Sequence, residues 1–211
     1  MTVPFYKLML VTHRQNQPIS NYLAFIEACL DSGVTSVQLR EKDATVAFLF
    51  DYAIKLKTLL DPYHVPLIIN DNLELALEIN ASGVHLGQSD GSPQLARQGL
   101  GAGKWLGLSI ETEEDLQRAN NCTVDYVAAS AVFPSQHKQN LRRIWGVTGL
   151  KFLTQQSQHP MIAIGGLNLQ NAEQIMAAGA QGIAVIGALH QARNPAQMAA
   201  KLRKIVERSG N

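Results

Sequence analysis

The chain has 211 residues, of which 46% are hydrophobic and 17% charged, and its formal net charge is +1. This length predicts one domain over residues 1–211, and the near-neutral charge does not suggest disorder, an acidic tail or a nucleic-acid surface. No stretch approaches the ~18 consecutive apolar residues that span a bilayer, and the N-terminus is a poor signal peptide. Cys29 and Cys122 show no metal or redox spacing. We therefore expect a soluble, cytoplasmic, globular protein without membrane or nucleic-acid partners.

Short apolar runs recur along the chain at nearly even spacing. There are eight of them, at residues 7–12, 36–40, 66–70, 83–87, 105–109, 125–130, 161–166 and 182–187. The intervals carry amphipathic helical patterns, for example over residues 20–31 and 45–60, and a last helix is expected at 196–208. The chain therefore reads as alternating strands and helices.

A weak internal repeat supports this division. Three segments read as a helix end, a glycine and a buried strand, and we expect Gly33, Gly83 and Gly179 to be left-handed helix caps. Ser92 is expected to begin one helix, and Asn168 to cap another that runs through 178.

Eight strand–helix units in a chain of this length predict an α/β fold, a single-domain (β/α)₈ TIM barrel. A doubly wound open sheet is the alternative. In a barrel, the active site lies at the carboxyl ends of the strands and in the loops that follow them. Polar residues after each apolar run are therefore the candidates for chemistry.

The second run ends in the stretch "QLREK", which carries two cations on one face. Side chains alternate along a strand, so Gln38, Arg40 and Lys42 point one way and Glu41 the other. A third cation, Lys138, is expected in the loop after the sixth run. Arg40, Lys42 and Lys138 together predict a clamp for an anion such as a phosphate. The alternative is an ion pair between Arg40 and Glu41 at the barrel rim.

Two aspartates follow the third and fourth runs. Asp71 and Asp90 would lie at the ends of neighbouring strands, where a pair of carboxylates suits Mg²⁺. That ion takes oxygen ligands and shares phosphate oxygens with a substrate. The alternative is that both are helix N-caps, a common role for aspartate. The neighbouring cations favour the metal.

Small residues follow the last two runs. Gly165-Gly166 and Gly187-Ala188 stand where many barrels hold a phosphate on backbone N–H groups, although "IGG" also ends many strands as a plain turn. Two anion sites and a magnesium site indicate a reaction that joins or splits phosphorylated substrates, one of them a diphosphate.

Three histidines lie near these positions. His85, inside the fourth run, and His13, just after the first, are expected to be hydrogen-bonded barrel residues. His137 lies among the substrate-loop residues "FPSQHK", where it either donates to a phosphate or merely flanks Lys138.

The ordered motifs "QLREK", "IND", "GVHLGQSD", "GLS", "FPSQHK", "AIGGL" and "GIAVIGAL" resemble those of thiamine phosphate synthases. The resemblance covers nearly the whole chain, and "QLREK" with "GVHLGQSD" is its most specific part. It implies a TIM-barrel transferase that joins a pyrimidine diphosphate to a thiazole phosphate and releases pyrophosphate with Mg²⁺. It also implies a dissociative mechanism, in which the diphosphate leaves first and the thiazole nitrogen traps a pyrimidine carbocation.

The resemblance assigns roles to residues by position. It implies that the pyrimidine diphosphate is held by Gln38, Arg40, Lys42 and Asn70. Mg²⁺ would be bound by Asp71 and Asp90, and the leaving pyrophosphate or the pyrimidine would be contacted by Ser109 and Lys138. The thiazole phosphate would be bound by Ser135, His137, Gly165 or Gly166, Ile186 and Gly187. The residues expected to promote the reaction are Arg40, Lys42, Ser109 and Lys138.

Three departures from the family pattern concern the second substrate. The segment 128–131 stands where the family has Gly-x-Gly-Pro, His137 replaces a threonine, and Gly187 replaces a serine. They leave two alternatives open: a thiazole tautomerase with His137 as its base, and a non-catalytic phosphate-binding barrel. Lys42 and the pair Asp71 and Asp90 favour the synthase. The sequence also leaves open a homodimer.

Overall fold

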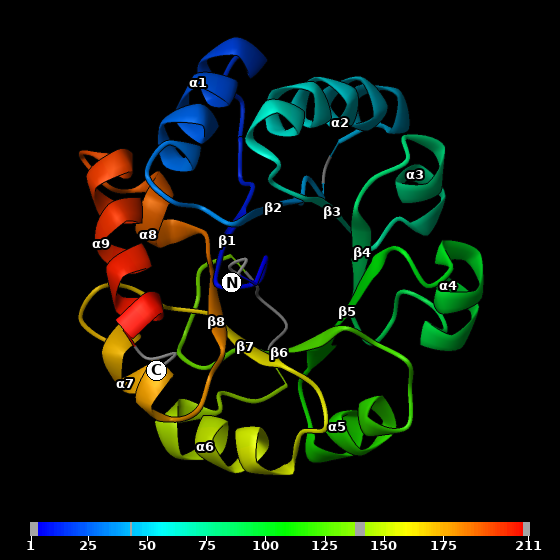
Figure 1. Ribbon diagram of the computed structural model, residues 1–211, viewed down its shortest axis with the longest axis vertical. Helices are drawn as coiled ribbons and strands as arrows, with labels where there is room; N and C mark the ends of the chain where they lie inside the picture. The colour runs from blue at the N-terminus through cyan, green and yellow to red at the C-terminus, as the bar shows by residue number, and fades with distance from the viewer. Residues whose placement is uncertain (1–3, 43, 138–141, 209–211) are drawn as a thin grey trace.

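The strands close into a barrel in sequence order. The computed structural model describes residues 4–42, 44–137 and 142–208, and in them eight parallel strands pair from β1 through β8 and back to β1 (Figure 1). Closure comes from the register that pairs Leu8 with Ile183 and Leu10 with Val185. The TIM barrel is therefore confirmed, and the open sheet is excluded.

The strands and helices lie close to the predicted ranges. The strands are β1 Leu8–Val11, β2 Ser36–Leu39, β3 Leu67–Asn70, β4 Gly83–Leu86, β5 Trp105–Ile110, β6 Tyr126–Ser130, β7 Met161–Ile164 and β8 Gly182–Val185. The helices are α1 Ile19–Leu30, α2 Val46–Leu60, α3 Leu73–Glu78, α4 Pro93–Leu100, α5 Glu113–Asn120, α6 Gly146–Gln156, α7 Ala172–Ala177, α8 Gly187–His190 and α9 Pro195–Arg208, with a 3₁₀ turn at Asp61–Tyr63. None of the helices in this described part of the chain has the length and hydropathy to cross a bilayer.

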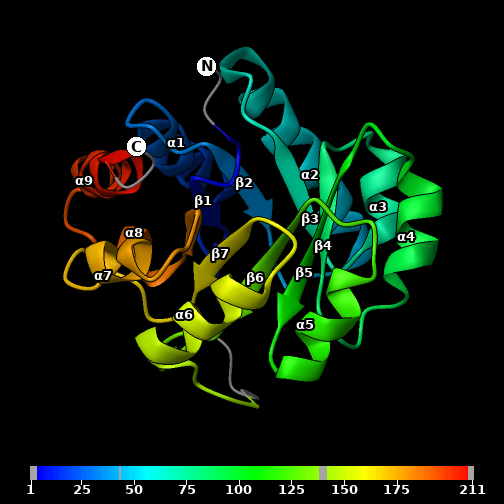
Figure 2. The same ribbon diagram turned by 60° about the horizontal axis from the view of Figure 1, so that its bottom comes forward.

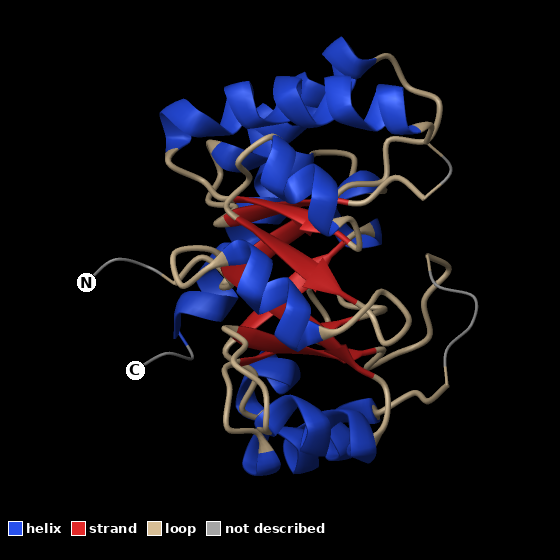
Figure 3. Cartoon of the chain, turned by 90° about the vertical axis from the view of Figure 1, so that its right-hand side faces the viewer, coloured by secondary structure: helices blue, strands red, loops and turns tan. Residues whose placement is uncertain are grey.

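The helices surround the barrel as an outer layer. In Figure 3 the strands form the central layer and the helices cover it, while α9 packs against α1, α7 and α8 (Figure 2). The larger apolar core fills the space between strands and helices, and a smaller cluster fills the barrel itself. Because every strand is covered on its outer face, the strands read in sequence as nearly continuous apolar runs.

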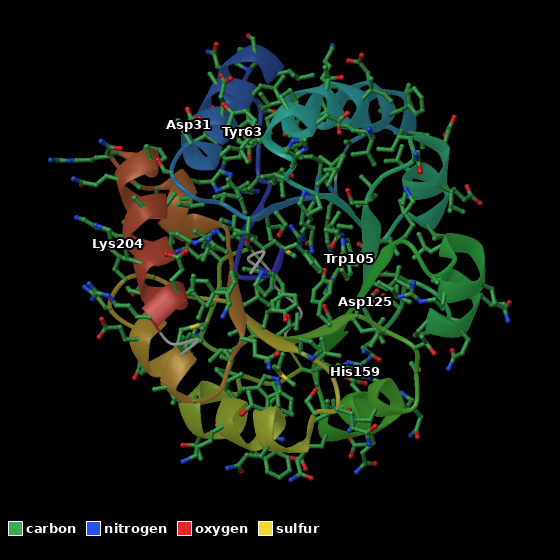
Figure 4. The ribbon with its side chains drawn as sticks, viewed as in Figure 1. Asp31, Tyr63, Trp105, Asp125, His159 and Lys204 are labelled. Atoms are coloured by element: carbon green, nitrogen blue, oxygen red, sulfur yellow. The ribbon has the colours of Figure 1, made fainter. Side chains whose placement is uncertain are left out.

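Aromatic rings fill the amino-terminal end of the barrel. Phe5 stacks on Trp105 with ring centroids 4.4 Å apart and meets Tyr126 edge-on at 5.5 Å. Trp105 is labelled in Figure 4, at the start of β5. With this end filled, the opposite end of the barrel is the one that remains open for a ligand.

Two of the three predicted glycine caps are confirmed. Gly33 and Gly179 have φ of +102° and +97°, in the left-handed region. Gly83 was wrongly predicted as a cap, because it lies inside β4 and the left-handed residue is Asn80, with φ of 53°. Gly83 is needed for another reason: a Cβ there would lie 2.2 Å from the carbonyl oxygen of Trp105.

One of the two predicted helix starts is confirmed. The hydroxyl of Ser92 accepts from the Leu95 N–H at 3.4 Å and caps α4. The Asn168 cap is wrong, since α7 begins only after Asn171. Asn168 instead accepts from the N–H of Gln170 at 2.8 Å, closing a local turn that comes before the helix.

Candidate active site

A cavity of about 780 Å³ opens at the carboxyl ends of the strands. The described candidates all line it: Gln38, Arg40, Lys42, Asn70, Asp71, Asp90, Ser109, Ser135, His137, Gly165, Gly166, Ile186 and Gly187. Lys138 lies outside the described residues. The barrel therefore gathers, around one cavity, residues that are spread over most of the sequence.

The cationic side of the cavity comes from β2 and the residues after it. Gln38 is buried inside the barrel, and Arg40 and Lys42 continue the same face into the cavity. The guanidinium of Arg40 also donates to the carbonyl of His137 at 3.2 Å. Glu41 points the other way and accepts from the Arg14 N–H at 3.0 Å. The predicted alternation of side chains is therefore present.

Two carboxyl groups meet beside these cations. The N–H of Asp71 donates to the carbonyl of His85 at 2.8 Å, which carries the β3–β4 pairing one residue further. Its side chain is in hydrogen-bond contact with that of Asp90. Asp90 also accepts from the N–H of Gly87 at 2.8 Å and from the hydroxyl of Ser89 at 3.1 Å.

The helix-cap alternative for these aspartates is wrong. Asn72 caps α3 by accepting from the Leu75 N–H at 2.9 Å, and Ser92 caps α4. The adjacent polar residues satisfy the helix starts, and the carboxyl groups of Asp71 and Asp90 point to the cavity instead.

The electrostatics of the pair suit a cation. Burial, followed by the hydrogen bond to Asp90 and its charge, raises the pKa of Asp71 to about 7. Burial would also raise the pKa of Asp90, but hydrogen bonds from Asp71, Gly87 and Ser89 outweigh it and lower that pKa. Two carboxylates this close disfavour ionising together unless a cation compensates them.

The donor set fits magnesium. Among the described residues no cluster of three or more histidine, cysteine or acidic side chains could hold a metal. Zinc sites usually need three or four such ligands, whereas Mg²⁺ is commonly held by one or two carboxylates together with substrate phosphates and water. Asp71 and Asp90, which line the cavity beside Arg40 and Lys42, fit the second pattern.

A buried polar chain forms the floor of the cavity. His85 lies 3.0 Å from the hydroxyl of Tyr126 through Nδ1 and 3.0 Å from that of Ser109 through Nε2. The phenol of Tyr126 also receives a hydrogen bond from Gln38, which directs its amide to the sulfur of Met9 at 3.6 Å. His85 is thus a hydrogen-bonded barrel residue, as expected, and it contacts the candidate Ser109 directly and the candidate Gln38 through Tyr126.

The opposite wall is built from glycine. Gly165 and Gly166 have φ of +100° and +64°, and both face the loop after β6. A Cβ on Gly165 would lie 2.4 Å from the Cβ of Ala131, and one on Gly166 would lie 2.6 Å from the carbonyl oxygen of Pro134. These glycines are therefore required by the close approach of the loop as well as by the backbone conformation.

Other lining residues were not predicted. Ser130, Glu111, Gln88 and Arg142 also line the cavity. Gln88 donates to the carbonyl of Ser109 at 2.5 Å, and Arg142 Nε lies 3.8 Å from a carboxylate oxygen of Glu111. Ser130 ends β6 and Glu111 directly follows β5, so the strand-end rule would have found them.

Comparisons with known proteins agree with one another. A family model described as thiamine monophosphate synthase matches residues 8–189. A thiamine-phosphate synthase from Chlamydia caviae is 44% identical over 99% of this chain and 98% of its own length. One from Chlamydia abortus is 43% identical over 97% and 96%. A solved thiamine phosphate pyrophosphorylase from Pyrococcus furiosus is 29% identical, covers 98% of both chains and superposes with a TM-score of 0.88.

Proposed function

This chain belongs to the thiamine monophosphate synthase family, and we propose that its cavity carries out the transfer with Mg²⁺ held by Asp71 and Asp90. The family match and the named relatives establish the activity as that of a thiamine-phosphate synthase, a transferase acting on small molecules. The metal, the order of bond changes and the roles of individual residues are the parts proposed here.

The reaction exchanges one bond for another. The carbon–oxygen bond between the methylene of 4-amino-2-methyl-5-hydroxymethylpyrimidine diphosphate and its diphosphate breaks, and pyrophosphate leaves with the electron pair. The thiazole nitrogen then forms a bond to the resulting carbocation, which gives thiamine phosphate. Such a path needs little proton transfer, and it depends on stabilising charge on the leaving group.

The cationic side of the cavity suits the diphosphate. Arg40 presents a planar fork of donors and Lys42 a mobile point charge, and both line the cavity. They would balance the charge that grows on the leaving pyrophosphate, with Lys138 as a third cation. Gln38, Asn70 and Ser109, from the ends of β2, β3 and β5, would orient the pyrimidine. The hydrogen bond between His85 and the hydroxyl of Ser109 supports this orientation by holding that hydroxyl in place.

Asp71 and Asp90 would hold the metal on the same side. When bound, Mg²⁺ neutralises charge on diphosphate oxygens and so makes pyrophosphate a better leaving group. The raised pKa of Asp71 supports this assignment, because its causes, burial first and then the neighbouring Asp90, both disfavour the carboxylate that a bound cation would stabilise.

The glycine side of the cavity suits the thiazole phosphate. Ser135 and His137 would offer side-chain donors, and the backbone at Gly165 or Gly166, Ile186 and Gly187 would offer N–H groups. The methyl groups of Ala128 and Ala131 also line this region, so they would shape the space left for the thiazole ring.

One observation carries the proposal: an acidic pair and the side chains of Arg40 and Lys42 line a single cavity that also reaches the glycine wall. The test is pyrophosphate release by the purified full chain with both substrates, with each omitted in turn, and with Mg²⁺ replaced by EDTA. Release that requires both substrates and the metal supports the proposal. Release that persists in EDTA contradicts the metal.

The same assay separates the alternative functions. A thiazole tautomerase or a non-catalytic barrel would bind thiazole phosphate and release no pyrophosphate, whereas the relatives named above are synthases. The homodimer and the cytoplasmic location stay predictions, which light scattering and cell fractionation would test.

A further inference from the structure

Two departures from the family pattern meet in space. His137 lies in the loop after β6, and Gly187 begins α8 after β8. A Cβ built on Gly187 would lie 3.2 Å from Nε2 of His137, a distance tighter than most real Cβ contacts. The imidazole therefore occupies the space over Gly187 that a side chain at that position would enter.

A third residue, His13, packs against this imidazole. The ring of His13, just after β1, meets that of His137 edge-to-face, with centroids 4.6 Å apart and planes at 71°. Two hydrogen bonds hold His13. Its backbone N–H donates to the hydroxyl of Tyr22 at 2.8 Å, and its ring nitrogen Nε2 accepts from the Gln15 amide at 3.2 Å. His137 is among the residues that line the cavity, whereas His13 is not.

The backbone of His137 is anchored as well. Its N–H donates to the hydroxyl of Ser135 at 3.3 Å, and its carbonyl accepts from Arg40 at 3.2 Å. The backbone of His137 is therefore hydrogen-bonded to its own loop and to the residue that follows β2. Its ring contacts His13 and lies over Gly187.

We propose that His13 is a positioning residue for His137, and that Gly187 lacks a side chain so that the His137 imidazole can face the phosphate of the thiazole substrate. This inference rests on the proposed function, since it specifies how the second substrate's phosphate monoester is held. Burial, with the charges of His13 and Arg40, lowers the pKa of His137. A ring N–H of the imidazole can donate to a phosphate oxygen in either protonation state.

The first test is a double-mutant cycle on His137 and Gly187. Gly187→Ser should raise the KM for thiazole phosphate by about tenfold and leave the KM for pyrimidine diphosphate within about twofold. His137→Ala should also raise the first KM. In the His137→Ala background, Gly187→Ser should raise the KM for thiazole phosphate by less than about a further twofold. The imidazole that the serine would displace is absent from that background.

A matched control separates this contact from the general effect of replacing a glycine. Gly103→Ser is the control, since no heavy atom lies within 4 Å of a Cβ built there. It should leave both KM values unchanged. Additive effects of His137→Ala and Gly187→Ser would overturn the proposed contact.

The second test concerns His13. His13→Ala should raise the KM for thiazole phosphate by about fivefold without changing kcat at saturation, because a loosened His137 binds phosphate less well. His13→Phe keeps an aromatic edge against the imidazole and should restore most of that loss. Melting temperatures of both variants show whether folding is affected. No effect of His13→Ala, or an equal rise in both KM values, would overturn the positioning role.

These outcomes are separate from those of the metal proposal. Calorimetric binding of thiazole phosphate alone, without pyrimidine diphosphate and with EDTA present, should repeat the coupling between His137 and Gly187. If turnover proves independent of Mg²⁺, this coupling is still expected. If wild-type protein binds no thiazole phosphate and Gly187→Ser leaves its KM unchanged, the inference fails while the metal proposal stands.

Discussion

Asp71 and Asp90 follow neighbouring strands, and their carboxyl groups are in hydrogen-bond contact at the rim of the cavity. A bound cation would compensate the charges of both carboxylates, so removing one of these charges should abolish metal binding. Replacing aspartate by asparagine does this with almost no change in the shape of the side chain. We expect Asp90→Asn to lower Mg²⁺-dependent kcat by about 100-fold or more, with thiazole phosphate binding within about threefold of wild type.

Steady-state kinetics over a range of Mg²⁺ concentrations would measure this effect. Asp51→Asn is a matched control, since Asp51 is an exposed α2 residue paired with Lys55 at 2.6 Å. It removes the same charge at a residue that does not line the cavity, and it should leave kcat unchanged. Normal activity of Asp90→Asn would show that the pair does not bind the metal.

Tyr126 supports the floor of the cavity through its contact with His85. Tyr126→Phe removes a hydroxyl from a fully buried site and leaves Nδ1 of His85 without that partner. We expect the free energy of unfolding to fall by about 1–3 kcal/mol, and the KM for pyrimidine diphosphate to rise because Gln38 and Ser109 lose their alignment. Urea unfolding and steady-state kinetics would measure the two effects.

A half-buried tyrosine with an exposed hydrogen bond provides the comparison. Tyr63 donates to Asp31 at 3.0 Å on the surface, where Figure 4 labels both residues near the end of α1. Tyr63→Phe should change the free energy of unfolding by no more than about 0.5 kcal/mol, because water replaces the lost partner. If Tyr126→Phe and Tyr63→Phe lost the same free energy of unfolding, the buried hydrogen bond between Tyr126 and His85 would contribute no more than an exposed one.

Gly165 combines a left-handed backbone with a close approach to Ala131. Gly165→Ala should lower the free energy of unfolding by about 2 kcal/mol or more, through φ strain together with the clash against the loop after β6. Thermal or urea unfolding would measure it.

Two other glycines separate these causes. Gly91 has φ of +111° and open space around a built Cβ, whereas Gly103 has open space without a positive φ. Gly91→Ala should therefore lose only about 1 kcal/mol, and Gly103→Ala almost nothing. A Gly165→Ala variant no less stable than Gly91→Ala would contradict the packing argument.

His190 predicts how stability depends on pH. Burial, with smaller contributions from His13 and His137, lowers its pKa to about 4 even though Ile186 accepts from its Nδ1. Between about pH 6.5 and 4 the unfolded chain binds a proton that the folded chain does not, so stability is present above 6.5 and falls as the pH drops. This one group should account for about 2 kcal/mol of loss between about pH 7.5 and 5.

A variant that cannot titrate isolates this effect. His190→Gln keeps an amide that can donate to Ile186, and its stability should fall less steeply with acid than that of wild type. Urea unfolding at about pH 7.5 and 5 compares the two, since other groups titrate alike in both. Parallel pH profiles for the two proteins would rule out His190 as the source.

Helix starts show where sequence reasoning succeeded and where it failed. Ser92 was predicted correctly because a serine before a proline carries its capping signal locally. Asn168 failed because its side chain satisfies a turn before α7, and nothing in the local pattern distinguishes that turn from a cap. Gly83 failed for a similar reason: its close neighbour is Trp105, which lies on the adjacent strand.

The sequence by itself determined the barrel and the end of it at which the candidate residues lie. The spacing of apolar runs reports how often the chain crosses the core, and the residue that follows a strand is read directly from the chain. For this reason the sequence predicts that Arg40, Asp71 and Ser109 lie at the same end of the barrel, and all three line the cavity.

Only the tertiary structure decided which of these residues touch. Three contacts join separate strand–loop units: Asp71 with Asp90, Tyr126 with His85, and the edge-to-face rings of His13 and His137. Such distances depend on strand register and on the path of each loop, and a shift of one residue in register turns a side chain to the other face. No local pattern encodes that geometry, so it had to come from the closed barrel.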